Sequence, residues 1–153
     1  MARSVCVCVC VCVCVDYRVL NKASPKDNFL LPHIDILVYN AAKNVTYLFM
    51  DGFSGYNLII MAEQDKEKTT FVIPWGTFCY KVMTFGLRNA SVTYQRVMVT
   101  LFHDMMHQEM KVCVDDIFAK SKKREDHEQE LKKLFERLWK FRLTLNPTKC
   151  FFG

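Results

Sequence analysis

The sequence contains 153 residues, of which 51% are hydrophobic and 24% are charged, a composition typical of one globular domain with a buried core. It contains no stretch of about 20 apolar residues, which excludes a membrane-spanning helix, and we expect no membrane partner. The formal net charge of +5 is compatible with a polyanionic partner, although many unrelated domains are equally basic.

A low-complexity repeat occupies the N-terminus. Residues 5–15 alternate Val and Cys and contain five of the 8 cysteines. Neighbouring cysteines on one face of a strand are poorly placed for a disulfide, and no Cys-x-x-Cys pair or histidine partner indicates a metal site. Alternating GTG and TGT codons encode Val-Cys, so we interpret residues 1–15 as a translated dinucleotide repeat outside the native domain. The alternative, a Cys-rich secreted or metal-binding protein, depends on residues 6–14 alone.

The sequence after the repeat favours an intracellular protein. No small-residue cleavage site follows the apolar run, because Asp16, Tyr17 and Arg18 come next. The remaining cysteines are scattered, and we expect them to be core thiols. They are Cys79, Cys113 and Cys150. We therefore expect a cytoplasmic or nuclear protein that is not secreted.

The chain then mixes strand-like and helical patterns. Residues 24–28 form a turn-rich connector, and Pro32 favours the start of a helix with a short apolar stripe over residues 34–38. Short apolar runs predict strands at residues 46–51, 58–62, 69–73 and 78–83, with a turn at residues 74–77.

Two longer segments predict amphipathic helices that pack on a sheet. The first begins near Asn89 or Ser91, and the second covers residues 125–141. The apolar stripe of the first contains Val97, Met98, Leu101, Phe102 and Met105. The stripe of the second contains Leu131, Leu134, Phe135, Leu138 and Phe141.

Three acidic residues stand where predicted strands end or turn. Asp51 ends the apolar run at residues 46–50, while Asp115 and Asp116 form the turn of a predicted hairpin over residues 111–119. If these strands are neighbours, three carboxylates meet, and a hard cation such as Mg²⁺ would offset their repulsion. Two such ions can stabilise both oxygens of a phosphoryl transfer. The alternative for each acid is an ordinary turn residue or strand-end cap.

Six blocks of the sequence, in order, resemble the reverse transcriptase domain of gypsy-type retrotransposon Pol polyproteins with long terminal repeats. The most specific are Met50-Asp51 followed by Ser54-Gly55-Tyr56, the segment 85–90 with its Phe-Gly-Leu, and Cys113-Val114-Asp115-Asp116, which stands where the family has Tyr-x-Asp-Asp. The six blocks are residues 15–22, 31–35, 50–56, 85–95, 113–116 and 145–153.

The resemblance implies an α+β fold: a palm-type antiparallel sheet with helices on one face, and partial fingers, within residues 16–153. Residues 15–22 resemble the family's fingers strand. The implied activity is RNA-directed DNA synthesis on a primed RNA or DNA template from deoxynucleoside triphosphates. Asp51, Asp115 and Asp116 are the implied catalytic residues and ligands of Mg²⁺, with Mn²⁺ as a substitute.

The resemblance also implies a nucleotide site. Tyr56 matches the aromatic gate beneath the nucleotide sugar, Phe85 and Gly86 match the floor of the nucleotide and template pocket, and Lys149 matches a lysine near the triphosphate. Gln95 and Arg96 match positions that face the template strand. The alternatives are aromatic packing for Tyr56, a surface lysine for Lys149, and a solvated helix face for the last two.

Two departures from the family bear on activity. Cys12 stands where the family has an arginine that grips the triphosphate, and a thiol cannot make that bidentate contact. Cys113 replaces the Tyr that supports the primer end. The family also continues into a thumb and an RNase H domain, which would be partners supplied by the rest of a Pol polyprotein. We therefore expect impaired synthesis, with a catalytically inactive remnant that binds nucleic acid weakly as the alternative.

Overall fold

The computed structural model describes residues 14–32, 39, 46–53, 55–106, 110–121 and 124–152. The helix expected after Pro32 and the substitution at Cys12 lie outside these residues, as does most of the Val-Cys repeat. In chain order the elements are α1 (Arg18–Ala23), β1 (Thr46–Phe53), η1 (Gly55–Leu58), α3 (Glu63–Lys66), η2 (Glu67–Thr69), β2 (Phe71–Ile73), β3 (Gly76–Phe78), α4 (Ala90–Leu101), β4 (Met110–Cys113), β5 (Asp116–Ser121), α5 (Arg124–Lys140), β6 (Thr144–Leu145), η3 (Pro147–Lys149) and β7 (Phe151–Phe152), where η denotes a 3-10 helix.

The main sheet is antiparallel and has the strand order β4-β5-β1-β6, with β7 also paired to β1. The predicted hairpin is confirmed, because β4 and β5 pair directly and place Cys113 opposite Asp116. The predicted strand at residues 46–51 is also confirmed. It pairs with β5, with Met50 opposite Ile117 and Asp51 opposite Asp116.

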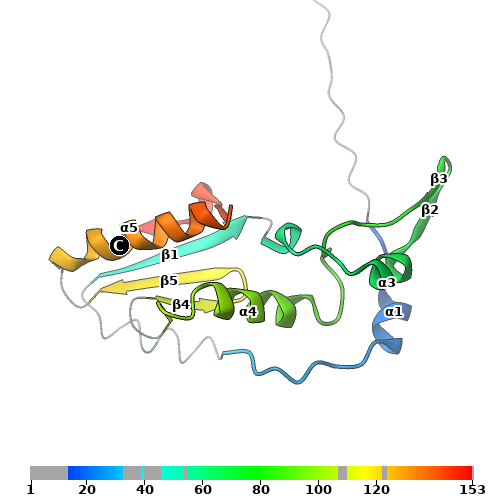
Figure 1. Ribbon diagram of the computed structural model, residues 1–153, viewed down its shortest axis with the longest axis horizontal. Coiled ribbons are helices and arrows are strands. Elements are labelled where there is room, and N and C mark those ends of the chain that lie inside the picture. The colour runs from blue at the N-terminus through cyan, green and yellow to red at the C-terminus, as the bar shows by residue number, and fades with distance from the viewer. Residues whose placement is uncertain are drawn as a thin grey trace, which may run out of the picture.

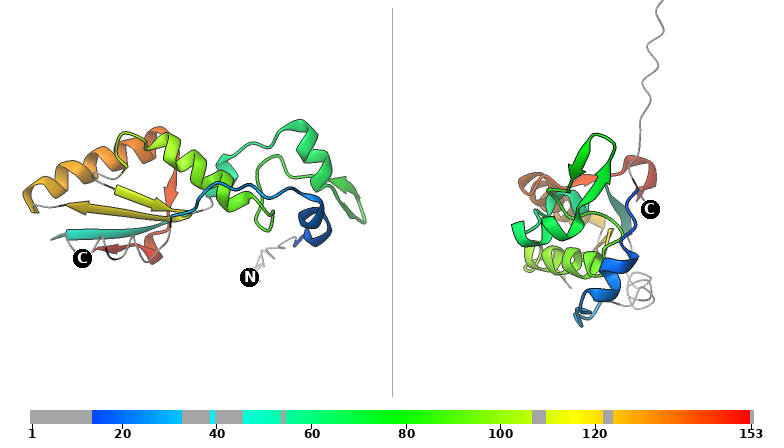
Figure 2. Two further views of the ribbon diagram at one scale, coloured as in Figure 1. Left: turned by 90° about the horizontal axis from the view of Figure 1, so that it is seen from below. Right: turned by 90° about the vertical axis from the view of Figure 1, so that its right-hand side faces the viewer.

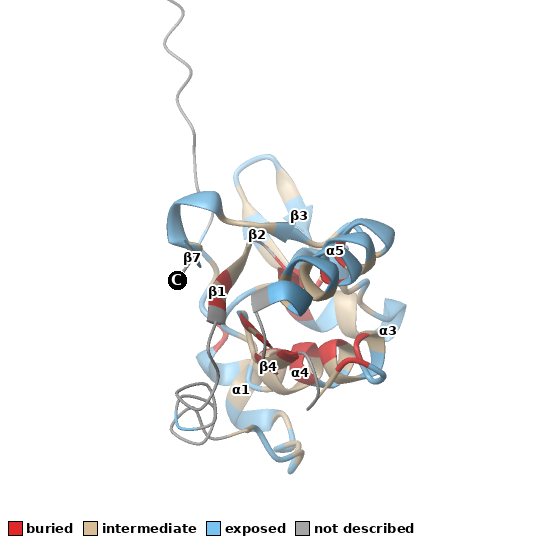
Figure 3. Ribbon diagram, turned by 90° about the vertical axis from the view of Figure 1, so that its left-hand side faces the viewer, coloured by how far each residue is buried: buried red, intermediate tan, exposed pale blue. Residues whose placement is uncertain are grey.

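Both long helices lie on the same face of this sheet (Figures 1 and 2). Side chains alternate between the two faces of a strand, so alternate residues of β1, β4 and β5 point toward the helices. The buried residues that they contribute to the core are Leu48, Met50, Met110, Val112, Ile117 and Ala119. Met98 of α4, Phe102 directly after that helix, and Leu134 and Leu138 of α5 complete this layer. Figure 3 shows buried stretches, in red, on β1 and α4. The α+β fold with helices on one face is therefore confirmed.

The predicted stripe on α5 is wider than the buried one. Leu134 and Leu138 are 1% and 3% exposed, whereas Phe135 is 41% exposed. Arg137 fixes α5 beside the end of α4, because its guanidinium donates to the carbonyl of Leu101 at 2.9 Å and pairs with Asp104 at 2.7 Å. None of the helices in the described ranges is both long enough and apolar enough to cross a bilayer.

Two predicted strands are wrong. Residues 18–23, within the segment that resembles a fingers strand, form the helix α1. The N-cap residue, Tyr17, makes no side-chain capping bond, but the Asp16 carboxylate before it accepts a hydrogen bond from the backbone N–H of Arg18 at 2.9 Å, a local Asx-type contact at the start of the helix. Residues 58–62 form the end of η1 and one isolated bridge, between Ile60 and Val82. The strands expected at residues 69–73 and 78–83 shorten and shift to β2 and β3.

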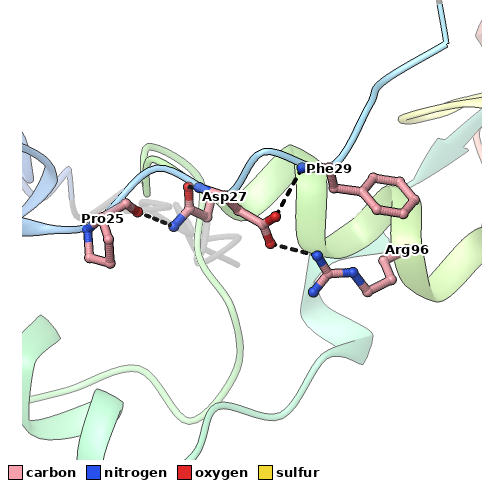
Figure 4. A network of polar contacts seen from close by, with 5 residues as sticks. Pro25, Asp27, Phe29 and Arg96 are labelled. Atoms are coloured by element: carbon pink, nitrogen blue, oxygen red, sulfur yellow. Dashed lines mark hydrogen bonds and ion pairs between the residues drawn. The ribbon is translucent and has the colours of Figure 1, made fainter.

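The connector after α1 is held against the outer face of α4 (Figure 4). The Asn89 side chain donates to the carbonyl of Pro25 at 2.9 Å and accepts from the N–H of Asp27 at 3.2 Å. Arg96 forms an ion pair with Asp27 at 2.7 Å and lies 5.1 Å from the centre of the Phe29 ring. Residues 24–29 therefore cross α4 through polar and cation–π contacts.

The core assignment predicts a sharp contrast between two neighbouring residues of α5. Leu138→Ala should lower the free energy of unfolding by about 2–5 kcal/mol, because it leaves a cavity under the helix. Trp139→Ala is the matched control: Trp139 is 87% exposed, so its loss should change stability by less than about 0.5 kcal/mol. Urea unfolding measures both, and equal effects would contradict the assignment of this helix face to the core.

Candidate active site

The three predicted acids come together at one end of the sheet. Asp51 lies opposite Asp116 across β1 and β5, where paired Cβ atoms are about 5 Å apart. Asp115 precedes β5 in the hairpin turn, and its carbonyl accepts the N–H of Gly52 at 2.8 Å. Because Met50 points toward the helices, alternation places Asp51 and Asp116 on the face opposite the two long helices.

Burial and mutual repulsion set the protonation behaviour of this acidic cluster. Burial raises the pKa of Asp115, and the negative charges of Asp51 and Asp116 raise it further, while Lys149 lowers it. The pKa of Asp116 is raised in the same way by burial and by Asp51. One carboxylate oxygen of Asp115, Oδ1, is buried and accepts no hydrogen bond from the described residues. The site thus holds a desolvated acceptor that the protein itself leaves unsatisfied.

Lys149 supplies the positive charge that partly offsets these acids. Its Nζ lies 3.3 Å from Oδ2 of Asp51. The preceding turn fixes its position: the N–H of Asn146 donates to the carbonyl of Asp51 at 2.9 Å, and the Asn146 side chain accepts from the N–H of Thr148 at 3.2 Å. Lys149 therefore lies at the end of β1, although it follows that strand by about 95 residues in the sequence.

Comparison with known proteins identifies this arrangement. A family model described as "Reverse transcriptase (RNA-dependent DNA polymerase)" matches residues 8–153. The chain belongs to the reverse transcriptase family.

Its relatives include retrotransposon Pol polyproteins. The chain is 34% identical over 113 residues, 74% of its length, to the retrovirus-related Pol polyprotein from transposon gypsy of Drosophila melanogaster. It is 31% identical over 90% of its length to that from transposon 297 of the same species, and 30% identical over 90% to the transposon Tf2-3 polyprotein of Schizosaccharomyces pombe. The matches span 11%, 13% and 10% of those polyproteins.

Solved structures confirm the fold. The foamy viral protease-reverse transcriptase in complex with an RNA/DNA hybrid superimposes with a TM-score of 0.79 at 20% identity, covering 90% of this chain and 18% of that one. A form of the same protein in complex with double-stranded DNA gives a TM-score of 0.80 at 20% identity and covers 90% of this chain and 24% of that one. The reverse transcriptase fold predicted from the six sequence blocks is therefore confirmed.

Of the residues expected to form the nucleotide site of this reverse transcriptase domain, Lys149 lies beside Asp51, whereas Tyr56, Phe85 and Gly86 lie near the start of α4. Tyr56 is 4% exposed; its ring stacks on Tyr94 with 5.1 Å between ring centres and lies 4.5 Å from the ring centre of Phe85. Its hydroxyl lies 3.3 Å from that of Ser91. Tyr56 therefore packs against two aromatic rings, which is the alternative to its role as an aromatic gate beneath the nucleotide sugar.

Phe85 is 62% exposed and forms a surface next to Tyr56. Gly86 follows with φ of +88°, a left-handed conformation that favours glycine. Its carbonyl accepts a hydrogen bond from the side chain of Asn21 at 2.7 Å. The structure thus brings Tyr56 and Phe85 together and anchors Gly86 to α1.

Gln95 does not face solvent, so its assignment to a template-facing or solvated surface is wrong. It is 1% exposed, and its side chain bonds the backbone of the hairpin that carries Asp115. Arg96, next to it, is exposed and pairs with Asp27. A signal was available in the sequence: Gln95 precedes Met98 by three residues and so lies on the apolar stripe of α4.

Tyr94 was also missed as a site residue. It is 1% exposed, and its hydroxyl has no hydrogen-bond partner among the described residues. Burial, and then the charge of Asp115, raise the pKa of this phenol. Its ring fills the space beside Gly55, where an added Cβ would lie 2.6 Å from a ring carbon. Glycine at position 55 therefore permits the close approach of α4 to the end of β1.

Cysteines contribute little to the site. Cys113 is half-buried in the hairpin, and Cys150 is half-buried near β7. The prediction of a core thiol is wrong for Cys79, which is exposed because the strand expected over residues 78–83 ends at Phe78.

The Gly55–Tyr94 contact predicts a coupled pair of substitutions. Gly55→Ala should lower the free energy of unfolding by about 1–3 kcal/mol, because the new methyl group overlaps the Tyr94 ring. In a Tyr94→Leu background the same change should cost clearly less. Denaturant unfolding of the four proteins in this double-mutant cycle measures the coupling, and strictly additive effects would contradict the contact.

The raised pKa of Asp115 predicts that its charge destabilises the fold at neutral pH. A carboxyl whose pKa is higher when folded contributes most stability below its ordinary value of 3.8 and loses it as pH rises through the folded value. Without added metal, Asp115→Asn should therefore be more stable than wild type at neutral pH, with the difference shrinking as pH falls toward 3.8. Thermal unfolding across pH, with exposed Asp126→Asn as control, measures this. A less stable Asp115→Asn protein at neutral pH would refute it.

Proposed function

We propose that this reverse transcriptase domain adds deoxynucleotides to a primer on an RNA or DNA template. The observation that supports the proposal most strongly is the buried, unpartnered Oδ1 of Asp115 beside Asp51 and Asp116. A fold that needed these residues only for a turn would not leave several carboxylates repelling one another in a partly desolvated place.

The donor set of the acidic cluster suits a divalent cation. Carboxylate oxygens are the ligands that Mg²⁺ and Mn²⁺ prefer, and the unsatisfied Oδ1 of Asp115 suits such an ion. No group of three or more His, Cys, Asp or Glu side chains in the described ranges forms a ready-made metal cluster. Mg²⁺ is commonly held by one or two carboxylates together with substrate phosphates, so an incomplete protein shell fits a site that a nucleotide completes.

In this proposal Asp51 and Asp115 hold the cations and Asp116 lies beside them. The bound cations would stabilise the attacking and leaving oxygens when the primer 3′-hydroxyl displaces pyrophosphate from the α-phosphate. The protein's own contribution is to hold Asp51 and Asp116 on adjacent strands, with Asp115 in the turn before β5, and to keep one carboxylate oxygen of Asp115 buried. Lys149 would hold Asp51 through their 3.3 Å ion pair and would be the group that donates a proton to departing pyrophosphate.

Tyr56 and Phe85 would form the base and sugar side of the nucleotide pocket. Only Phe85 offers a broad exposed ring, whereas Tyr56 supports it from below. Gly86, whose left-handed backbone favours glycine, follows Phe85 in this surface. The nucleic-acid partner is proposed by analogy with the foamy viral relative, which was solved with an RNA/DNA hybrid and with double-stranded DNA.

Primer extension tests this function. With a poly(rA) template, an oligo(dT) primer and dTTP, the chain should incorporate nucleotide only when Mg²⁺ or Mn²⁺ is present. Asp115→Asn should reduce incorporation by roughly 100-fold or more, since each factor of ten corresponds to about 1.4 kcal/mol of barrier. Asp126→Asn, the same change at an exposed position of α5, should leave incorporation unchanged.

Two outcomes would overturn the proposal. Incorporation that persists in Asp115→Asn would mean that the acidic cluster is not catalytic. No incorporation by folded wild-type protein would favour the inactive remnant, and salt-dependent RNA binding that survives Asp115→Asn would then be its remaining activity.

A further inference from the structure

The side chain of Gln95 joins α4 to the turn that carries Asp115. Its Nε2 donates to the carbonyl of Val112 at 2.9 Å, and its Oε1 accepts from the N–H of Val114 at 2.6 Å. It is 1% exposed. One amide therefore satisfies an acceptor at the end of β4, through a buried bond, and a donor inside the turn, through a part-buried one.

The turn needs such support because its backbone is unfavourable. Val114 has φ of +52°, in the left-handed region that hairpin turns usually assign to Gly, Asn or Asp. A β-branched residue is a clear outlier there, and such residues persist only where the surroundings hold them. Asp115 follows directly, so any relaxation of Val114 would move the Asp115 carboxylate.

The turn is held from two sides. Gln95 holds the N–H of Val114, and on the other side the N–H of Gly52 donates to the carbonyl of Asp115 at 2.8 Å. The second bond belongs to the sheet itself, whereas the first comes from a side chain on a helix that the hairpin meets only through tertiary packing. The Asp115 peptide therefore lies between one strand contact and one helix contact.

We propose that Gln95 is a positioning residue that fixes the Asp115 carboxylate by holding the backbone of its turn. It contacts neither substrate nor cation in this role. Glutamine suits the position because one side chain must offer both a donor and an acceptor at a fixed distance. Glutamate would present a negative charge to the Val112 carbonyl in a buried place, and methionine would leave both backbone groups unpaired. The catalytic consequence rests on the proposed function, but the geometric one does not.

The test replaces Gln95 with Met, which has similar length and no strong hydrogen-bonding group. NMR amide exchange should speed at Val114 by roughly tenfold or more, while the Met50 amide in the middle of β1 changes little. Mn²⁺ affinity, measured by electron paramagnetic resonance on the folded protein without nucleotide, should fall by roughly tenfold. In primer extension, kcat should fall while the KM for dTTP stays near wild type.

Gln129→Met is the matched control, because it makes the same chemical change at an exposed position of α5 and should alter none of these values. Unchanged Val114 exchange and unchanged Mn²⁺ affinity in folded Gln95→Met would overturn the proposal. Faster exchange at all amides with unchanged Mn²⁺ affinity would also overturn it, since that is the behaviour of a purely structural residue. Should Gln95→Met fail to fold, Gln95→Asn, which is one methylene shorter, is measured against the same criteria.

The result separates this proposal from the proposed function. If wild-type protein extends no primer, the polymerase assignment fails, yet Val114 exchange and Mn²⁺ binding still decide whether Gln95 positions Asp115. If wild-type protein extends primers and Gln95→Met matches it in every measurement, only the positioning role fails.

Discussion

The antiparallel register of β1 and β5 is the constraint on which the site depends. Leu48 and Met50 lie opposite Ala119 and Ile117 and are buried beneath the helices. A slip of one residue would turn this apolar set outward and bring Asp51 into the core. The burial of aliphatic side chains thus fixes the register, and the register places two carboxylates opposite each other on the face opposite the two long helices. The acids themselves provide no energy for this arrangement, because they repel one another.

The fold tolerates that repulsion because backbone contacts surround the acids. The carbonyl of Asp51 accepts from Asn146, and the carbonyl of Asp115 accepts from Gly52. These bonds hold the peptide groups whatever the charge of the side chains. Lys149 then offsets part of the charge of Asp51. A site built in this way is expected where function, rather than stability, has selected the residues.

The sequence predicted secondary structure best in long segments with a regular hydrophobic period and in strands with strict apolar–polar alternation. The second helix, the strand that ends near Asp51 and the Asp115-Asp116 hairpin were all predicted because burial imposes a regular pattern on them. The predictions for two short segments were wrong. Residues that resemble a strand form α1, with a local contact between Asp16 and the N–H of Arg18 at its start, and residues 58–62 lack a continuous partner strand. Gln95 was misplaced because a polar residue in an apolar stripe shows its purpose only when the buried backbone groups that it satisfies are known.

Three consecutive residues of α4 connect these features. Tyr94 packs against Gly55 after β1, Gln95 holds the turn before Asp115, and Arg96 points outward to Asp27 in the connector. Successive residues on a helix are about 100° apart, so a single turn of α4 contacts both acid-bearing segments on one side and the connector on the other. Through these contacts α4 reaches both acid-bearing segments, whose relation is set by the β1–β5 register and by the bond between Gly52 and Asp115.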